Sequence, residues 1–175
     1  PITLTRAGEP TGEATALPNP DTATPDINSN LTVDFGFYQP LSLGNLIWHD
    51  QNDNGTFDTG EPGIANVVVS LYASDGATLI MTTTTDLAGN YLFSNLAPGD
   101  YIVEIDRTSP ALSGFVSSTD LPTSTTPNGN VDSDDNGVLV TATTVRSAPI
   151  TLVGGTEPND DPAQPPGNAN QNNTL

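Results

Sequence analysis

The sequence predicts an all-β fold built around one sandwich core. Helical periodicity is almost absent, and short runs in which polar and apolar residues alternate recur along the chain. Gly, Pro, Asn and Asp separate these runs, as turn residues separate strands. Many short strands between frequent turns indicate an all-β protein rather than a helical or mixed one.

Eight segments have the alternation expected of β-strands, a number that suits one sandwich. They comprise residues 31–38, 42–48, 64–73, 78–85, 90–95, 100–107, 138–145 and 149–153. Asp75-Gly76 predicts a tight hairpin between the third and fourth of these segments, because both residues tolerate the positive φ of such turns. The apolar residues expected to share a face are Tyr101, Val103 and Ile105 in one strand, and Val33, Phe35 and Phe37 in another.

Composition divides the chain into three parts. Residues 41–153 carry the predicted sandwich, residues 1–40 form an N-terminal extension with its own strand at 31–38, and residues 154–175 form a polar tail rich in Pro and Asn. Most of the extension and all of the tail bury little apolar surface, so we expect them to stay extended or mobile.

Residues 50–61 form a complete twelve-residue calcium-loop pattern. Oxygen-bearing side chains occupy positions 1, 3, 5 and 9, glycine occupies position 6, and glutamate occupies position 12. Pro62-Gly63 and a β-branched run follow, so the loop is expected to join strands rather than EF-hand helices. A Ca²⁺ site between strands holds a module rigid more often than it senses a signal.

A second acidic cluster, residues 128–137, repeats half of this pattern. Its candidate ligands are Asp132, Asp134 and Asn136, but Thr143 stands where position 12 would need glutamate. One interpretation is a second Ca²⁺ site completed by carboxylates from another loop. The other is a turn rich in Asp and Asn that binds no metal. Asp86 is a candidate for either role.

The charge excludes several classes of function. The net charge is −18, with three arginines and no lysine among 175 residues, so phosphate backbones would be repelled and nucleic acid is not an expected partner. No apolar run approaches a membrane span, so we expect no membrane insertion and interpret the chain as a mature, extracellular segment. The chain has one histidine and no cysteine or lysine, so few of its residues could form a catalytic nucleophile with its general base. We therefore expect that the protein is not an enzyme.

The two ends of the chain contain related sequences. Pro1-Ile2-Thr3-Leu4 recurs as Pro149-Ile150-Thr151-Leu152, and Asn30-Leu31-Thr32 is similar to Asn172-Asn173-Thr174-Leu175. The first copy continues into the 31–38 strand, whereas the second copy stops. We therefore expect the module to lack its last strand and residues 31–38 to act as a donor strand for a neighbouring copy.

Several motifs together resemble a known family. Residues 85–103 resemble the signature of collagen-adhesin B-type repeats. Residues 43–48, which lead into the calcium loop, and residues 32–38 are similar to the calcium-binding B repeats (SdrD B-like) of serine-aspartate-repeat surface adhesins. The resemblance implies an immunoglobulin-like β-sandwich, repeated in tandem on a cell surface, that stiffens with calcium and serves as a stalk.

The resemblance also implies the ligands of the first loop. The implied side-chain ligands are Asp50, Asn52, Asn54, Asp58 and Glu61, and Thr56 is implied as a carbonyl ligand. Relatives of the wider B-type family lock their fold with a bond between lysine and asparagine. This chain has no lysine and cannot form that bond, so bound calcium is the remaining candidate for stabilising the fold.

The leading hypothesis is a calcium-rigidified extracellular module that links end to end with copies of itself into a stalk or filament. Donation between separate chains is preferred over a slice of one tandem chain. The alternative is an adhesin or carbohydrate-binding module whose partner is a surface glycan. Asn30 and Asn172 match the acceptor pattern for N-glycosylation, which predicts that the protein is a glycoprotein.

Overall fold

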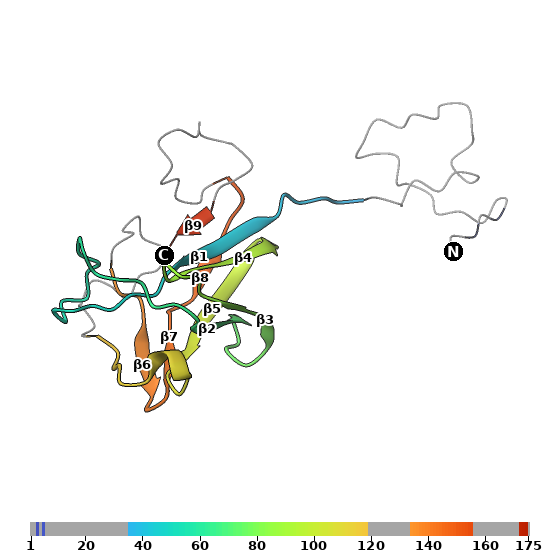
Figure 1. Ribbon diagram of the computed structural model, residues 1–175. Helices are drawn as coiled ribbons and strands as arrows, with labels where there is room; N and C mark the ends of the chain where they lie inside the picture. The colour runs from blue at the N-terminus through green and yellow to red at the C-terminus, as the bar shows by residue number, and fades with distance from the viewer. Residues whose placement is uncertain (1–2, 4, 6–34, 119–133, 156–171, 175) are drawn as a thin grey trace. The chain divides into compact units, whose positions relative to one another are not determined.

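The computed structural model contains two β-sheets (Figure 1). The structure describes residues 3, 5, 35–118, 134–155 and 172–174. The chain divides into two units, Pro1–Tyr38 and Gln39–Leu175, and every described strand belongs to the second unit.

The smaller sheet has the strand order β4-β1-β9, and the larger has the order β3-β2-β5-β7-β6, with β8 also paired to β5. The strands are β1 (Leu41–Leu46), β2 (Val68–Ala73), β3 (Leu79–Thr84), β4 (Asn90–Leu96), β5 (Gly99–Asp106), β6 (Val138–Thr141), β7 (Thr144–Arg146), β8 (Ile150–Leu152) and β9 (Asn172–Thr174). All pairs are antiparallel except β1 with β9, which is parallel.

The predicted all-β sandwich is confirmed. The described residues contain only one helix, the three-residue 3-10 turn η3 (Pro110–Leu112). Within these ranges no helix has the length and apolar character needed to cross a bilayer.

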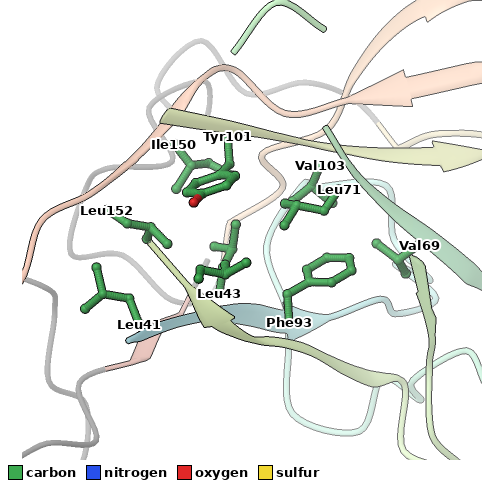
Figure 2. Close-up of a cluster of buried hydrophobic side chains, with 10 residues drawn as sticks. Leu41, Leu43, Val69, Leu71, Phe93, Tyr101, Val103, Ile150 and Leu152 are labelled. Atoms are coloured by element: carbon green, nitrogen blue, oxygen red, sulfur yellow. The ribbon is translucent and has the colours of Figure 1, made fainter. Parts of the chain in front are cut away.

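One apolar core joins the two sheets (Figure 2). The buried residues of the smaller sheet are Leu41, Leu43, Phe93 and Leu96, and those of the larger sheet are Val69, Leu71, Tyr101, Val103, Ile150 and Leu152. The alternation in the sequence predicted this face for Tyr101 and Val103 in β5, where the intervening residue is less buried. Burial of these side chains provides the main drive for folding.

The predicted Asp75-Gly76 hairpin joins β2 to β3. Gly76 has a φ of 63°, and the carboxylate of Asp75 accepts hydrogen bonds from the Thr78 hydroxyl (2.6 Å), the Thr78 amide (2.8 Å) and the Ala77 amide (2.9 Å). These bonds favour the ionised carboxylate and lower the pKa of Asp75 to about 2. The side chain of Asp75 therefore stabilises the turn that the sequence predicted.

The single strand predicted at 138–145 is wrong, because this segment is the hairpin of β6 and β7. Arg107, which is not part of this hairpin, holds the turn between the two strands. The Arg107 amide donates to the Thr143 carbonyl (2.9 Å), and Arg107 Nη1 donates to the Ala142 carbonyl (3.1 Å). The strand predicted at 64–73 also begins later, at Val68, because Asn66 has a φ of 62° and interrupts the extended backbone.

The ends of the chain differ from the sequence predictions in two places. β9 lies in the segment predicted to be a polar tail. Of the predicted 31–38 strand, residues 31–34 lie outside the described residues, and residues 35–38 form no strand. Phe35 and Phe37 are 80% and 93% exposed. The assignment of 1–40, 41–153 and 154–175 as separate parts stays a prediction.

Truncating Leu71 tests the core. Leu71 has no exposed surface, whereas Leu87 is 92% exposed. We expect Leu71→Ala to lower the free energy of unfolding by about 2–5 kcal/mol, because it removes buried methyl groups and leaves a cavity. Leu87→Ala should change it by less than about 0.5 kcal/mol. Urea denaturation measures both, and equal effects would contradict the assigned core.

Candidate metal centre

The 50–61 loop projects from a short stem that continues β1. Trp48 and Gly63 form an antiparallel bridge. The His49 amide donates to the Pro62 carbonyl (2.9 Å), and the Ile64 amide donates to the Ile47 carbonyl (2.7 Å). The backbone therefore returns beside itself after the loop, which confirms that the loop joins extended segments rather than helices.

Two glycines allow the stem to pass close to the start of β4. The Ile47 amide donates to the Gly89 carbonyl (2.9 Å). A Cβ atom on Gly63 would lie 1.7 Å from the Ala88 carbonyl oxygen, and one on Gly89 would lie 2.7 Å from the Gly63 Cα atom. Larger residues at these positions would push the loop away from the sheet.

Three side chains of the loop converge on one another. Asp58 Oδ2 accepts hydrogen bonds from Asn52 Nδ2 and from Asn54 Nδ2, both at 2.9 Å. The residues at positions 3, 5 and 9 of the calcium pattern thus meet at one oxygen atom. Rotating the two carboxamides would present their Oδ1 atoms to the same point.

The first and last residues of the loop bind its backbone. Asp50 Oδ2 accepts from the Gly55 amide (2.8 Å), and Glu61 accepts from the Gln51 amide (2.8 Å) and the Asp58 amide (3.0 Å). Desolvation alone would raise the pKa of Asp50, but backbone N–H groups led by that of Gly55 outweigh it and lower the pKa. The Asp50 carboxylate therefore stays ionised, as a cation ligand must.

The described part of the second cluster lies against the first loop. Thr56 and Asp134 form an isolated antiparallel bridge, and the Asp135 amide donates to the Gly55 carbonyl (2.9 Å). Two acidic segments about eighty residues apart in sequence are thus neighbours in space. The sequence suggested a partner loop for the second cluster but did not identify it.

Asp134 and Asn136 are also brought together, with Asn136 Nδ2 at 3.3 Å from Asp134 Oδ2. Asp132 lies outside the described residues. Asp135, which the sequence did not single out, accepts from the Gly137 amide (2.8 Å) and the Ser118 hydroxyl (3.0 Å). The bond from the Gly137 amide has the geometry of an Asx turn, so the described contacts fit either interpretation of this cluster.

Asp86 caps the turn before β4. Its Oδ1 atom accepts from the Ala88 amide (2.8 Å) and the Asn90 amide (2.9 Å). The hydrogen bonds from Asn90, followed by those from the Ala88 and Gly89 amides, lower the pKa of Asp86 against a smaller opposing effect of desolvation. The turn role is the one that the structure supports.

Thr85 is a structural residue that the sequence analysis missed. It is the buried polar residue of the described core, 4% exposed. Its hydroxyl accepts from the Val67 amide (2.9 Å) and donates to the Ile64 carbonyl (2.8 Å). This one side chain therefore fastens the segment that leaves the loop, and no local pattern in the sequence marks it.

A cavity of about 350 Å³ lies beside the end of β1, between the two sheets. Its apolar lining includes Ile47, Tyr91, Val103, Ile105, Leu112 and Val145. Trp48 and His49 also line it, and each contacts a further ring: Trp48 meets Phe57 at 6.0 Å between centroids, and His49 meets Phe115 at 5.0 Å. β1 therefore leads both to the cavity and to the calcium-loop pattern.

The oxygen-rich composition of the loop suits a hard cation such as Ca²⁺. The described residues contain no group of three or more His, Cys, Asp or Glu side chains arranged to hold an ion. The observed convergence consists instead of one carboxylate and two carboxamides. Such a set fits Ca²⁺, which takes amide oxygens, better than Zn²⁺, which takes nitrogen and sulfur.

Comparison with known proteins identifies a family and several relatives that the chain is similar to. The family model of the SdrD B-like domain matches residues 41–160. The chain is 36% identical over 127 residues to serine-aspartate repeat-containing protein D of Staphylococcus aureus (strain Newman), which covers 72% of this chain and 9% of that protein. It is 38% identical over 113 residues to serine-aspartate repeat-containing protein F of Staphylococcus epidermidis, which covers 64% of this chain and 6% of that protein.

Serine-aspartate repeat-containing protein I of Staphylococcus saprophyticus is 46% identical over 80 residues, which covers 45% of this chain and 4% of that protein. The chain thus spans less than a tenth of the length of these relatives.

Replacing Thr85 tests how the loop is fastened to the core. Thr85→Val keeps the shape of the side chain but leaves the Val67 amide and the Ile64 carbonyl without their partner. We expect a loss of about 1–3 kcal/mol in the free energy of unfolding. Thr84→Val, on the exposed neighbour, is the matched control and should change little. A loss no larger than that of the control would contradict the role assigned to Thr85.

Proposed function

The chain belongs to the SdrD B-like domain family, and from this premise we propose that it is a calcium-rigidified module that links end to end into a cell-surface stalk or filament. Family membership indicates a structural, non-enzymatic module of an extracellular surface protein. Calcium and strand donation are the parts that we propose.

The observation that carries the calcium proposal is the meeting of Asn52, Asn54 and Asp58 at one oxygen atom. In a calcium loop these residues occupy ligand positions 3, 5 and 9. Asp50 and Glu61, at positions 1 and 12, already bind the loop backbone. The Ca²⁺ ion would be held by these five side chains and the carbonyl of Thr56.

Calcium in this loop would stiffen more than the loop itself. Thr56 bridges to Asp134, so the loop and the 134–137 segment are already joined. The two segments bring carboxylates together in a chain whose net charge is −18, and a divalent cation would relieve their repulsion. We propose Asp132, Asp134 and Asn136 as ligands of a second ion at this junction.

End-to-end linkage is supported by the edge of the smaller sheet. β9 pairs with β1 through only three residues, Ser42, Leu43 and Gly44. β1 and its stem continue past this point, and strand addition to an exposed edge is a recurrent way of joining proteins. The proposed partners are neighbouring copies of the chain.

The cavity beside β1 favours a second candidate function, the binding of a ligand such as a surface glycan. Its volume of about 350 Å³ lies within the range of small-molecule sites, and aromatic residues are common in the lining of such sites, as they are here. Trp48 and Phe115 could stack on a sugar ring. Polymerisation without saturable glycan binding would favour the structural function.

Replacing Glu61 tests the calcium proposal. Glu61→Ala removes two backbone hydrogen bonds in every condition, but it removes a bidentate ligand only in calcium. A tenfold loss of affinity corresponds to about 1.4 kcal/mol, so we expect the variant's Tm to fall about 3–6 °C further in calcium than in chelator. Differential scanning calorimetry measures both.

Gln51→Ala is the matched control, because Gln51 is exposed and stands at a non-ligand position of the same loop. It should lower the Tm equally in both conditions. If Glu61→Ala also has the same effect with calcium and with chelator, calcium does not bind there.

The size of the native particle tests end-to-end linkage. In calcium, sedimentation and negative-stain microscopy should show polymers that fall to units of 18.1 kDa on denaturation. A native monomer at all concentrations would contradict linkage between separate chains.

A further inference from the structure

Resting on the proposed end-to-end linkage, we propose that the cavity beside β1 accepts residues 32–38 of a second copy, as a strand parallel to β1 with Phe35 paired to Ile47. The proposal names the occupant of the groove, the direction of the added strand and its register. The direction and the register follow from one observation, and the occupant follows from others.

The direction and register come from β9. This strand is parallel to β1, and Gly44 pairs with Thr174. The Asn-x-Thr sequence at Asn172–Thr174 has its counterpart at residues 30–32. A donated strand that replaced the end of β9 in the same register would therefore place Thr32 opposite Gly44, in the position that Thr174 occupies in the single chain.

Extending this register past Gly44 pairs each following residue with the continuation of β1. The resulting pairs are Val33 with Asn45, Asp34 with Leu46, and Phe35 with Ile47. The backbone there is oriented for such pairing. The amides of Ile47 and His49 donate on the opposite side, to Gly89 and Pro62, and successive backbone groups of a strand point in opposite directions. The amides of Leu46 and Trp48 therefore face the added strand.

The same register separates apolar from polar side chains. Directly paired residues on neighbouring strands point to the same face of a sheet. Leu43 is fully buried and Ile47 packs against the core, so their face is the inner one. Val33 and Phe35 would then enter the cavity, and Asp34 would face solvent. A shift of one residue would bury Asp34 and expose both apolar side chains.

The cavity suits this occupant. It is lined from both sheets, by Ile47 and Tyr91 on one side and by Val103, Ile105 and Val145 on the other. Apolar side chains of an added strand would be removed from water against these residues, which is favourable. An added strand would fill the cavity from the open edge without a change in strand order.

Trp48 supplies an independent observation. Its Nε1 atom is buried and has no hydrogen-bond partner among the described residues, and Trp48 is one of the residues around the cavity. A buried N–H group needs an acceptor. A strand laid beside β1 would bring a row of backbone carbonyls to this region, whereas an apolar small molecule would bring none.

The donor segment has the complementary property. Phe35 and Phe37 are 80% and 93% exposed, and Tyr38 is 60% exposed. Three large aromatic side chains within four residues form an exposed apolar patch, which usually marks an interaction site. Insertion into the groove would bury at least Phe35.

Disulfide trapping between two variants tests the register. The chain has no cysteine, so engineered thiols are the only ones present. Asp34→Cys chains mixed with Leu46→Cys chains should form a covalent dimer under mild oxidation, because directly paired residues lie within the Cα distance that a disulfide spans. Gly36→Cys mixed with Leu46→Cys is the control two residues out of register, and its yield should be at least about tenfold lower.

A double variant, Asp34→Cys with Leu46→Cys in one chain, identifies the occupant. Donation to a second copy predicts a ladder of covalent oligomers on a non-reducing gel. An intrachain disulfide without oligomers would overturn the proposal, because the segment would then occupy the groove of its own module.

The results separate this inference from the proposed function. Polymers that trap only at the shifted pair, or not at all, would overturn the register and leave end-to-end linkage standing. Absence of both polymers and trapping would overturn both. As a check without thiols, Phe35→Ala should weaken association about ten- to hundredfold, whereas Tyr38→Ala, on the solvent face of the added strand, should not.

Discussion

The pairing of β1 with β4 is the constraint on which the other features depend. Through this pairing Leu43 enters the core opposite Phe93, and the chain beyond Leu46 is directed into the calcium-loop stem. The other edge of the same strand receives β9. The core, the loop and the open edge thus meet on one strand, so a change at any of them acts on the others through a few residues of backbone.

Backbone N–H groups, rather than cationic side chains, are the main partners of the acidic residues in the described ranges. The chain has three arginines for 21 acidic residues. Asp50, Asp75 and Asp86 each accept backbone amides and have lowered pKa values. Turns built in this way hold carboxylates ionised. The proposed Ca²⁺ would offset the repulsion among the acidic residues of the loops.

The cavity connects the proposed stalk with the proposed strand donation. It lies beside Ile47, and a donated strand would both pair with the backbone edge of β1 and occupy the cavity. The loop stem lies at the same place, since Trp48 bridges to Gly63. A proposed joint between modules would thus lie next to the proposed calcium site, where added rigidity has the most effect on a filament.

The sequence by itself determined the features that depend on local chemistry. Alternation located β1 to β5 and β8, Asp75-Gly76 located a hairpin, and the spacing of oxygen-bearing residues placed Asn52, Asn54 and Asp58 around one point. Only the tertiary structure decided the rest. The Arg107 contacts divide residues 138–145 into two strands, and the bridge from Thr56 to Asp134 joins two loops. Such pairings depend on which segments meet in space, and a periodic pattern within one segment carries no information about its partner.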